Sequence, residues 1–297
     1  MLENAGKIVS KTLMFTILAL FAFAANSVLC RLALGENTID ASSFTVVRLL
    51  SGALVLFAIL RMSNKKKSLS SKGSWISSIM LFLYAVTFSF AYVTLDTGTG
   101  ALILFGSVQI TIIILSLFSG NRLHLSEWLG VSIAFAGFVY LVLPDVSTPS
   151  VKGFLFMAIA GISWGVYTLR GRGSDNPLAD TAQNFLRTVP LVLVLAIVTL
   201  HNAHYSTAGI VLAILSGAIA SGIGYTIWYV ALGGLSPTQA AVVQLSVPVI
   251  AALGGIVFVS EAITLRLAVS ATMILGGILT VVLGKYLFAR LRQVGRT

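Results

Sequence analysis

The chain has 297 residues, of which 57% are apolar and only 9% are charged. An ordinary soluble domain carries about 25% charged residues, so this composition excludes a soluble globular protein of this length. The net charge of +10 would suit a protein that binds nucleic acid. The lysines and arginines, however, lie mostly at the ends of apolar segments, which argues against such a partner.

Apolar stretches of about 17 to 23 residues, with almost no internal charge, follow one another along the chain. A helix of this length spans the ~30 Å hydrocarbon core of a bilayer and satisfies its own backbone hydrogen bonds. The stretches predict ten transmembrane helices, at residues 12–32, 42–60, 75–95, 99–119, 126–143, 153–169, 181–200, 208–231, 237–258 and 267–284. The expected fold class is an all-α polytopic membrane protein.

The basic residues divide unequally between the two sides of these helices. Fourteen lie on the side that holds both termini, and three, Arg31, Lys152 and Arg266, lie on the other. Lysine and arginine in short loops remain in the cytoplasm. We therefore expect a multi-pass protein of a bacterial inner membrane, with both termini cytoplasmic.

The chain also contains an internal repeat. A shift of 139 residues aligns Arg31 with Arg170 and Arg48 with Arg187. The expected units are two five-helix repeats, at about 1–145 and 146–297, in one integral membrane domain. Because five is odd, the second repeat must lie inverted in the membrane. Two inverted repeats can rock around a site near the midplane, which is the architecture of a carrier.

The end of the second repeat carries a recognisable pattern. Val247-Pro248-Val249 is followed by a glutamate-bearing turn, 259–265, and by Leu275-Gly276-Gly277. The chain resembles the drug/metabolite transporter superfamily, in its ten-helix branch of paired EamA repeats, and is similar within it to YddG-type amino-acid exporters. The first repeat departs from the pattern, since Val108 replaces the proline and Asn121-Arg122-Leu123 replaces the glutamate-bearing turn. The two halves are therefore not expected to move identically.

The resemblance implies a central cavity lined by helices 1, 3, 4, 6, 8 and 9. Polar and aromatic residues near mid-depth of these helices are the candidate substrate-binding residues: Asn26, Tyr84, Ser107, Gln109, Ser163, Trp164, Tyr225, Trp228, Gln244 and Ser246. A glutamine amide left unpaired in hydrocarbon costs several kcal/mol, so it must face protein or water. The alternative for the glutamines is packing between helices.

Two further features concern helix interiors. Pro248 lacks an N–H and would displace the carbonyl of Gln244, which makes it a candidate hinge. Arg48 and Arg187 lie about a third of the way into their helices and can snorkel toward the nearer interface. We interpret them as contacts to lipid headgroups or loop carbonyls rather than to a substrate carboxylate.

The positions of the other chemical groups narrow the function. All nine acidic residues and all three histidines fall at or outside the ends of the predicted helices, which disfavours proton coupling, a metal site and an intramembrane enzyme. There is no phosphate-binding loop, so we expect neither ATP nor any cofactor. The expected function is export or facilitated passage of small metabolites, chiefly aromatic or other neutral amino acids, by alternating access in a monomer. The alternative is a drug or nucleotide-sugar carrier.

Overall fold

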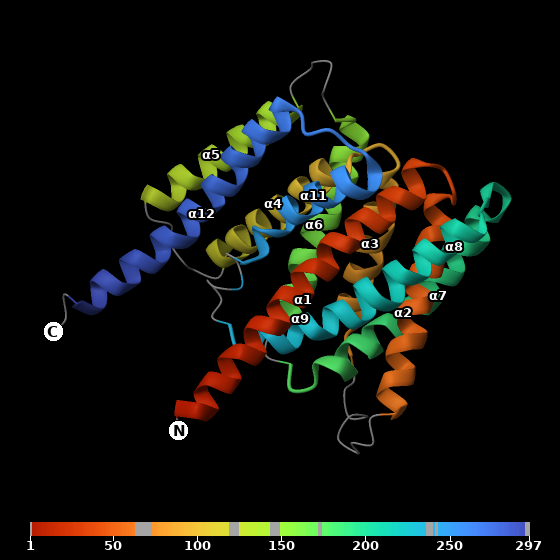
Figure 1. Cartoon of the computed structure of the whole chain (residues 1–297), viewed down its shortest axis with the longest axis horizontal. Helices are drawn as coiled ribbons and strands as arrows, with labels where there is room; N and C mark the ends of the chain where they lie inside the picture. The colour runs from red at the N-terminus through yellow and green to blue at the C-terminus, as the bar shows by residue number, and fades with distance from the viewer. Residues whose placement is uncertain are drawn as a thin grey trace.

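The computed structural model describes residues 2–62, 73–118, 125–142, 149–171, 174–235, 240 and 243–294. Within these ranges the regular structure is helical, apart from one isolated bridge between Ile39 and Tyr205. The helices are α1 (Leu2–Gly35), α2 (Ala41–Met62), α3 (Trp75–Tyr92), α4 (Thr97–Phe118), α5 (Leu125–Val142), α6 (Val151–Gly171), α7 (Pro177–Thr199), η2 (Leu200–Asn202), α8 (Thr207–Ile214), the π-helical η3 (Leu215–Ile223), α9 (Gly224–Leu232), α11 (Val247–Val259) and α12 (Leu265–Val294). Figure 1 shows that α1 begins and α12 ends at the same end of the bundle; we call the opposite end the far end.

The structure confirms an all-α polytopic membrane protein. Among the described residues, seven helices are long and apolar enough to cross a bilayer, and α8, η3 and α9 together form one of them, Thr207–Leu232. Three shorter apolar stretches occupy the places of the predicted fifth, ninth and tenth helices: Trp128–Leu141, Val247–Val259 and Leu265–Val281.

The predicted ninth helix, 237–258, is not continuous. Leu245 and Ser246 form a turn, and α11 begins only at Val247. Pro248 therefore stands in the first turn of α11, where its missing N–H breaks no hydrogen bond of the helix. The expected interior position of this proline is wrong, and its role as a hinge stays a prediction.

The packing of the helices follows the internal repeat. In the first repeat α1 packs on α8, α9 and α11, and in the second α6 packs on α3 and α4. Three pairs of corresponding helices contact each other directly: α2 with α7, α4 with α11 and α5 with α12. This exchange of partners is what two inverted repeats related by an in-plane axis produce. The α5–α12 pair stands at the periphery of the bundle (Figure 1).

Glycines allow two helix pairs, η3 with α2 and α5 with α12, to approach closely. A Cβ atom at Gly217 would lie 2.0 Å from the carbonyl oxygen of Arg48, so η3 lies directly on α2. A Cβ at Gly130 of α5 or at Gly277 of α12 would lie 2.5 Å from the carbonyl oxygen of the other. Helices in lipid associate through such close backbone packing, because burial of apolar surface gives them no advantage there.

Asp40 joins two turns at the far end. Its Oδ1 accepts hydrogen bonds from the backbone N–H groups of Ser42 and Ser43, 3.0 and 2.9 Å away, and so caps α2. Its Oδ2 accepts one from the N–H of His204, 3.1 Å away, in the turn before α8. Burial raises the pKa of the Asp40 carboxyl, but the hydrogen bonds from Ser43 and His204 outweigh burial and lower it below its ordinary value.

Asp40→Ala is expected to lower the free energy of unfolding by about 1 kcal/mol, because the cap and the link to His204 are lost. Since the folded-state pKa is lowered, this contribution is present above the unfolded pKa of about 3.9 and disappears as the pH falls through the folded-state pKa. Melting temperatures in detergent should differ by a constant amount between about pH 5 and 8 and converge below about pH 4. Asp40→Asn, which keeps the cap without a titrating group, is the control. A gap that persists unchanged at about pH 3 contradicts this assignment.

Candidate substrate-binding site

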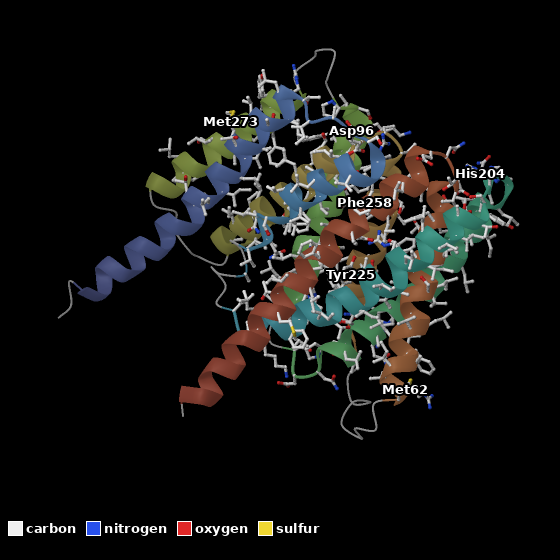
Figure 2. All side chains as sticks on the ribbon, viewed as in Figure 1. Met62, Asp96, His204, Tyr225, Phe258 and Met273 are labelled. Atoms are coloured by element: carbon white, nitrogen blue, oxygen red, sulfur yellow. The ribbon has the colours of Figure 1, made fainter. Side chains whose placement is uncertain are left out.

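Polar and aromatic side chains from both repeats meet in the interior of the bundle. We call them the central cluster; each is at most 5% exposed, and they are Phe23 and Asn26 of α1, Arg48 of α2, Tyr84 of α3, Trp164 of α6 and Tyr225 of α9. Figure 2 shows Tyr225 between the far end, marked by Asp96 and His204, and the opposite end, marked by Met62.

Trp164 is the centre of the aromatic contacts. Its ring centroid lies 4.5 Å from that of Tyr225 and 5.1 Å from that of Tyr84. Phe23 approaches it edge-on at 5.9 Å and also contacts Trp228 at 5.6 Å. Edge-to-face and tilted pairs at these distances are favourable, and here they form an apolar wall. The rings come from α1, α3, α6 and α9, so the wall is shared by the two repeats.

The hydroxyl of Tyr84 is the centre of the polar contacts. Asn26 donates to it from Nδ2 at 3.2 Å, and the hydroxyl of Tyr225 donates to it at 3.2 Å. The Oδ1 of Asn26 accepts a hydrogen bond of 2.6 Å from the hydroxyl of Ser216, which lies on η3. The wide π-helical turns of η3 thus bring a serine to α1, and such turns are frequent at functional sites.

The guanidinium of Arg48 points into this group. It donates from Nε to Ser221 at 3.2 Å, and from Nη2 to the hydroxyls of Tyr84 and Tyr225 at 3.2 and 3.1 Å. Its Cζ lies 5.2 Å from the ring centroid of Tyr84 and 4.8 Å from that of Phe88. The interpretation that Arg48 snorkels to an interface is wrong. An arginine at the centre of a membrane helix costs about 3 kcal/mol, which hydroxyl hydrogen bonds of about 1 kcal/mol each and two ring contacts offset.

Arg187, its counterpart in the second repeat, is placed differently. Its guanidinium lies 5.4 Å from the ring centroid of Trp75, which is 54% exposed. The repeat therefore supplies two arginines at corresponding positions, one within the central cluster and one at the periphery.

Three predicted residues lie in α4 and α6. Ser107 contacts α6 beside Gly161, where an added Cβ would lie 2.6 Å from the Cβ of Ser107, and it lines an apolar groove of about 440 Å³ between α4, α5 and α6. Gln109 and Ser163 are buried, with 2% and 1% of their surface exposed. The structure thus brings five of the predicted residues together at or beside the central cluster, namely Asn26, Tyr84, Trp164, Tyr225 and Trp228, and places Ser107 at a helix contact.

The other two predicted residues precede α11. Gln244 is 3% exposed and donates from Nε2 to the carbonyl of Ala240 at 3.1 Å, while its Oε1 has no hydrogen-bond partner within the described part of the chain. Ser246 donates to the carbonyl of Val243 at 2.6 Å. Both side chains therefore bond to their own segment, and the described residues leave one amide oxygen unmatched.

The cavity at the central cluster is small. It measures about 10 Å³ and is lined by residues of α1, α3, α4, α6 and α9: Phe23, Asn26, Tyr84, Phe88, Leu104, Phe105, Trp164 and Tyr225. That is about the space for one water molecule. Five of the six expected helices contribute to the lining, but aromatic rings fill the expected open cavity. A metabolite fits here only when these rings separate.

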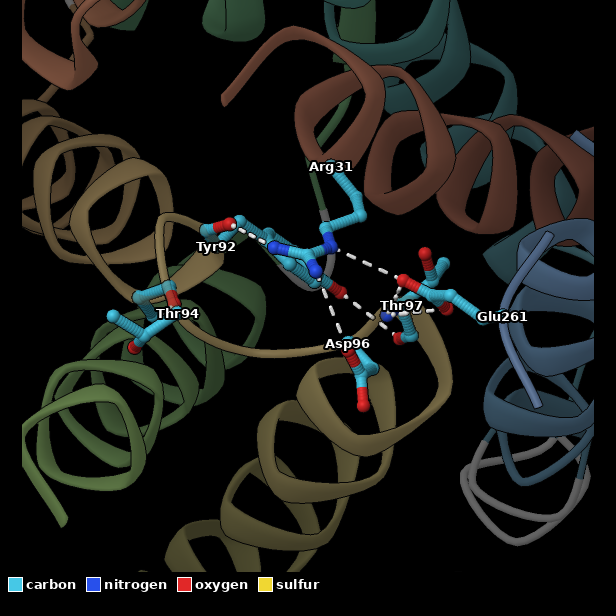
Figure 3. A network of polar contacts seen from close by, with 7 residues as sticks. Arg31, Tyr92, Thr94, Asp96, Thr97 and Glu261 are labelled. Carbon is cyan, nitrogen blue, oxygen red and sulfur yellow. Dashed lines mark hydrogen bonds and ion pairs between the residues drawn. The ribbon is translucent and has the colours of Figure 1, made fainter. Parts of the chain in front are cut away.

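A second polar network lies at the far end, and Figure 3 shows it from close by. Arg31 donates to Glu261 at 3.1 Å, to Asp96 at 3.3 Å and to the carbonyl of Tyr92 at 3.3 Å. The carboxylate of Glu261 also accepts from the first N–H of α4, that of Thr97, at 3.0 and 2.9 Å. We call these five residues the far latch. It joins α1, the α3–α4 turn and the end of α11, and so ties the two repeats together.

Sequence reasoning missed the far latch, because Arg31 and Glu261 are 230 residues apart. The one sequence signal that marked Arg31 was its alignment with Arg170 in the internal repeat. Arg170 donates to the hydroxyl of Ser74 at 3.3 Å, a neutral partner. The segment expected to correspond to the glutamate-bearing turn, 121–123, lies outside the described residues.

Residues 10–143 and 151–283 each match the EamA-like transporter family. The chain is 47% identical over 268 residues to the uncharacterized protein PA1977 of Pseudomonas aeruginosa, which covers 90% of this chain and 93% of that protein. It is 21% identical to the uncharacterized transporter YoaV of Bacillus subtilis, over 82% of this chain and 88% of that protein. A solved crystal structure superposes with a TM-score of 0.60 at 18% identity, over 88% of this chain and 94% of that one.

The solved structure supports the fold alone, and the narrower likeness to YddG-type exporters stays a prediction. The family, matched over both halves, and the relatives named as transporters identify a transporter rather than an enzyme. The chain therefore belongs to the EamA-like transporter family of the drug/metabolite transporter superfamily and is a multi-pass membrane transporter with two EamA domains.

Proposed function

We propose that this transporter moves small neutral or zwitterionic metabolites, chiefly amino acids with aromatic or other apolar side chains, by alternating access around the central cluster. The observation that carries the proposal is the position of this cluster, where α1, α2 and α3 of the first repeat meet α6 and α9 of the second. The rings around Trp164 suit an apolar body, and the hydroxyls and amide beside them suit the polar head of an amino acid.

In this mechanism the two inverted repeats rock against each other and open one end at a time. The far latch holds one end closed, and its release opens the cluster to that side. All nine acidic residues lie at or outside the ends of the predicted helices, which supports facilitated passage or weakly coupled exchange. We place the protein as a monomer in the inner membrane, with its termini in the cytoplasm and export as its direction.

Counterflow of labelled amino acids in liposomes tests this function. Wild-type protein should exchange at least one of the twenty amino acids. Trp164→Ala should slow exchange about tenfold, because the substrate loses its contacts to the indole ring, each worth about 1 kcal/mol. Gln244→Ala should also slow it, since it removes an amide whose Oε1 has no hydrogen-bond partner among the described residues. Trp128→Ala, at a ring 54% exposed on α5, is the matched control. No exchange by intact protein, or unchanged exchange in both site variants, contradicts the proposal.

The alternative is a carrier for drugs or nucleotide sugars. A site for organic cations would want a buried negative charge, and a nucleotide-sugar site would want several clustered cations. The central cluster has one cation, Arg48, and is otherwise neutral. Competition of labelled amino-acid exchange by organic cations and by sugar nucleotides separates these classes.

A further inference from the structure

We propose that Arg48 recognises the carboxylate of the substrate, so that the carrier selects molecules with a single carboxylate and rejects amines and amides that lack one. This inference rests on the proposed role of the central cluster as the binding site. It also replaces the lipid-facing role that the sequence suggested for this arginine with a substrate-facing one.

The first support is the unbalanced charge. Arg48 is 1% exposed, and its hydrogen-bond partners are the neutral hydroxyls of Ser221, Tyr84 and Tyr225. Its Nη1 is buried and has no hydrogen-bond partner among the described residues. Charged side chains are almost never fully buried unless they are paired. The described surroundings of Arg48 thus leave both a positive charge and an N–H donor to be matched.

The second support is geometry. The hydroxyls of Tyr84 and Tyr225 bind Arg48 from one side, and their rings line the central cavity together with Trp164. A ligand that separates these rings therefore reaches the guanidinium with its polar end and Trp164 with its apolar end. A guanidinium presents parallel N–H donors that fit a carboxylate, which a lysine or a neutral donor does not.

A purely structural role predicts something different. If Arg48 only links α2 to α3, η3 and α9, its loss lowers stability but leaves the choice among ligands unchanged. Arg187 provides the matched control, because it has the same side chain at the corresponding position of the second repeat and lies against Trp75 at the periphery.

The experiment uses purified full-length protein and pairs of ligands. L-Phenylalanine, L-leucine and L-alanine are each compared with the corresponding amide, and phenylalanine also with 3-phenylpropionate and phenethylamine. Binding is followed by thermal stabilisation and by intrinsic fluorescence. Two of the four tryptophans suit this readout, because Trp164 lines the cavity and Trp228 contacts Phe23 of the lining. We expect the carboxylate-bearing member of at least one pair to bind about tenfold more tightly than its amide, and phenylpropionate to bind where phenethylamine does not.

Variants assign the preference to a residue. Arg48→Gln should abolish the difference between acid and amide, and Arg187→Gln should keep it. Tyr225→Phe, which keeps the charge and removes one hydroxyl, should weaken binding while preserving the preference, and it serves if Arg48→Gln does not fold. Equal binding of acid and amide by wild type, no binding of any carboxylate ligand, or a preference retained in Arg48→Gln overturns the proposal. In that case, exchange of labelled amino acids in liposomes would still support the proposed function. Selective binding without exchange would instead contradict the carrier function and leave the role of Arg48 in place.

Discussion

Gly217→Ala is expected to destabilise the protein by about 3 kcal/mol, the largest stability effect of any single methyl group in the described chain that we foresee. The new Cβ would lie 2.0 Å from the carbonyl oxygen of Arg48 and 2.2 Å from the hydroxyl of Ser51. One of these obstacles is backbone, so a side-chain rotation cannot relieve the clash. η3 and α2 must separate, and Ser221 on η3 then moves away from Arg48, to which it is bonded at 3.2 Å.

Gly276→Ala is the matched control. Nothing lies within 4 Å of a Cβ built at Gly276 on α12, and alanine favours a helix over glycine by about 1 kcal/mol. The two substitutions should therefore change the melting temperature in opposite directions, measured in the same detergent by thermal unfolding. Equal melting temperatures for the two variants would show that η3 does not lie on α2 in the way described.

Glu261→Gln is expected to open the far end. The carboxylate of Glu261 is 12% exposed and bonds both Arg31 and the first N–H of α4, so loss of its charge weakens the closed arrangement by about 2 kcal/mol. That free energy corresponds to a roughly 30-fold shift toward the open arrangement. Cys30 reports the change without any engineered label, because it is the single cysteine of the chain, is 0% exposed and directly precedes Arg31 on α1. A maleimide should modify Cys30 markedly faster in Glu261→Gln than in wild type.

Two further variants make this test specific. Arg31→Gln should accelerate labelling to a similar extent, and the double variant should add little, because both residues act in the same network. Glu36→Gln, the same substitution at an exposed position of the α1–α2 turn, should label at the wild-type rate. Wild-type labelling of Cys30 in Glu261→Gln would mean that the far latch does not control this end.

The all-helical membrane fold and the repeat could be predicted because they depend on local or periodic features. The length of each apolar stretch identifies a membrane helix without knowledge of its neighbours. Asn26, Tyr84 and Trp164 were found by the same kind of reasoning, since polar and aromatic groups at mid-depth avoid lipid. Their contacts in the structure agree with that reasoning, and their role in binding remains a prediction.

The direction of Arg48 could not be predicted, because it depends on how α2 is rotated about its own axis. That rotation is set by η3, where Gly217 permits contact and Ser221 supplies an acceptor. Nothing in the apolar pattern of 208–231 indicates π-helical turns. The turn at Leu245 and Ser246 was missed for a related reason, since a proline two residues later is compatible with either a kink or a fresh helix start.

The different settings of Arg48 and Arg187 have a consequence for the transport cycle. Gene duplication supplied two equivalent cations, yet one faces the interior and the other the rim. In the proposed cycle, a substrate whose carboxylate is bound to Arg48 is held by the first repeat. It then keeps its position relative to the first repeat while the second repeat moves relative to both. Enantiomers, which share the acid group but present their side chains to different walls, should then be moved at unequal speeds.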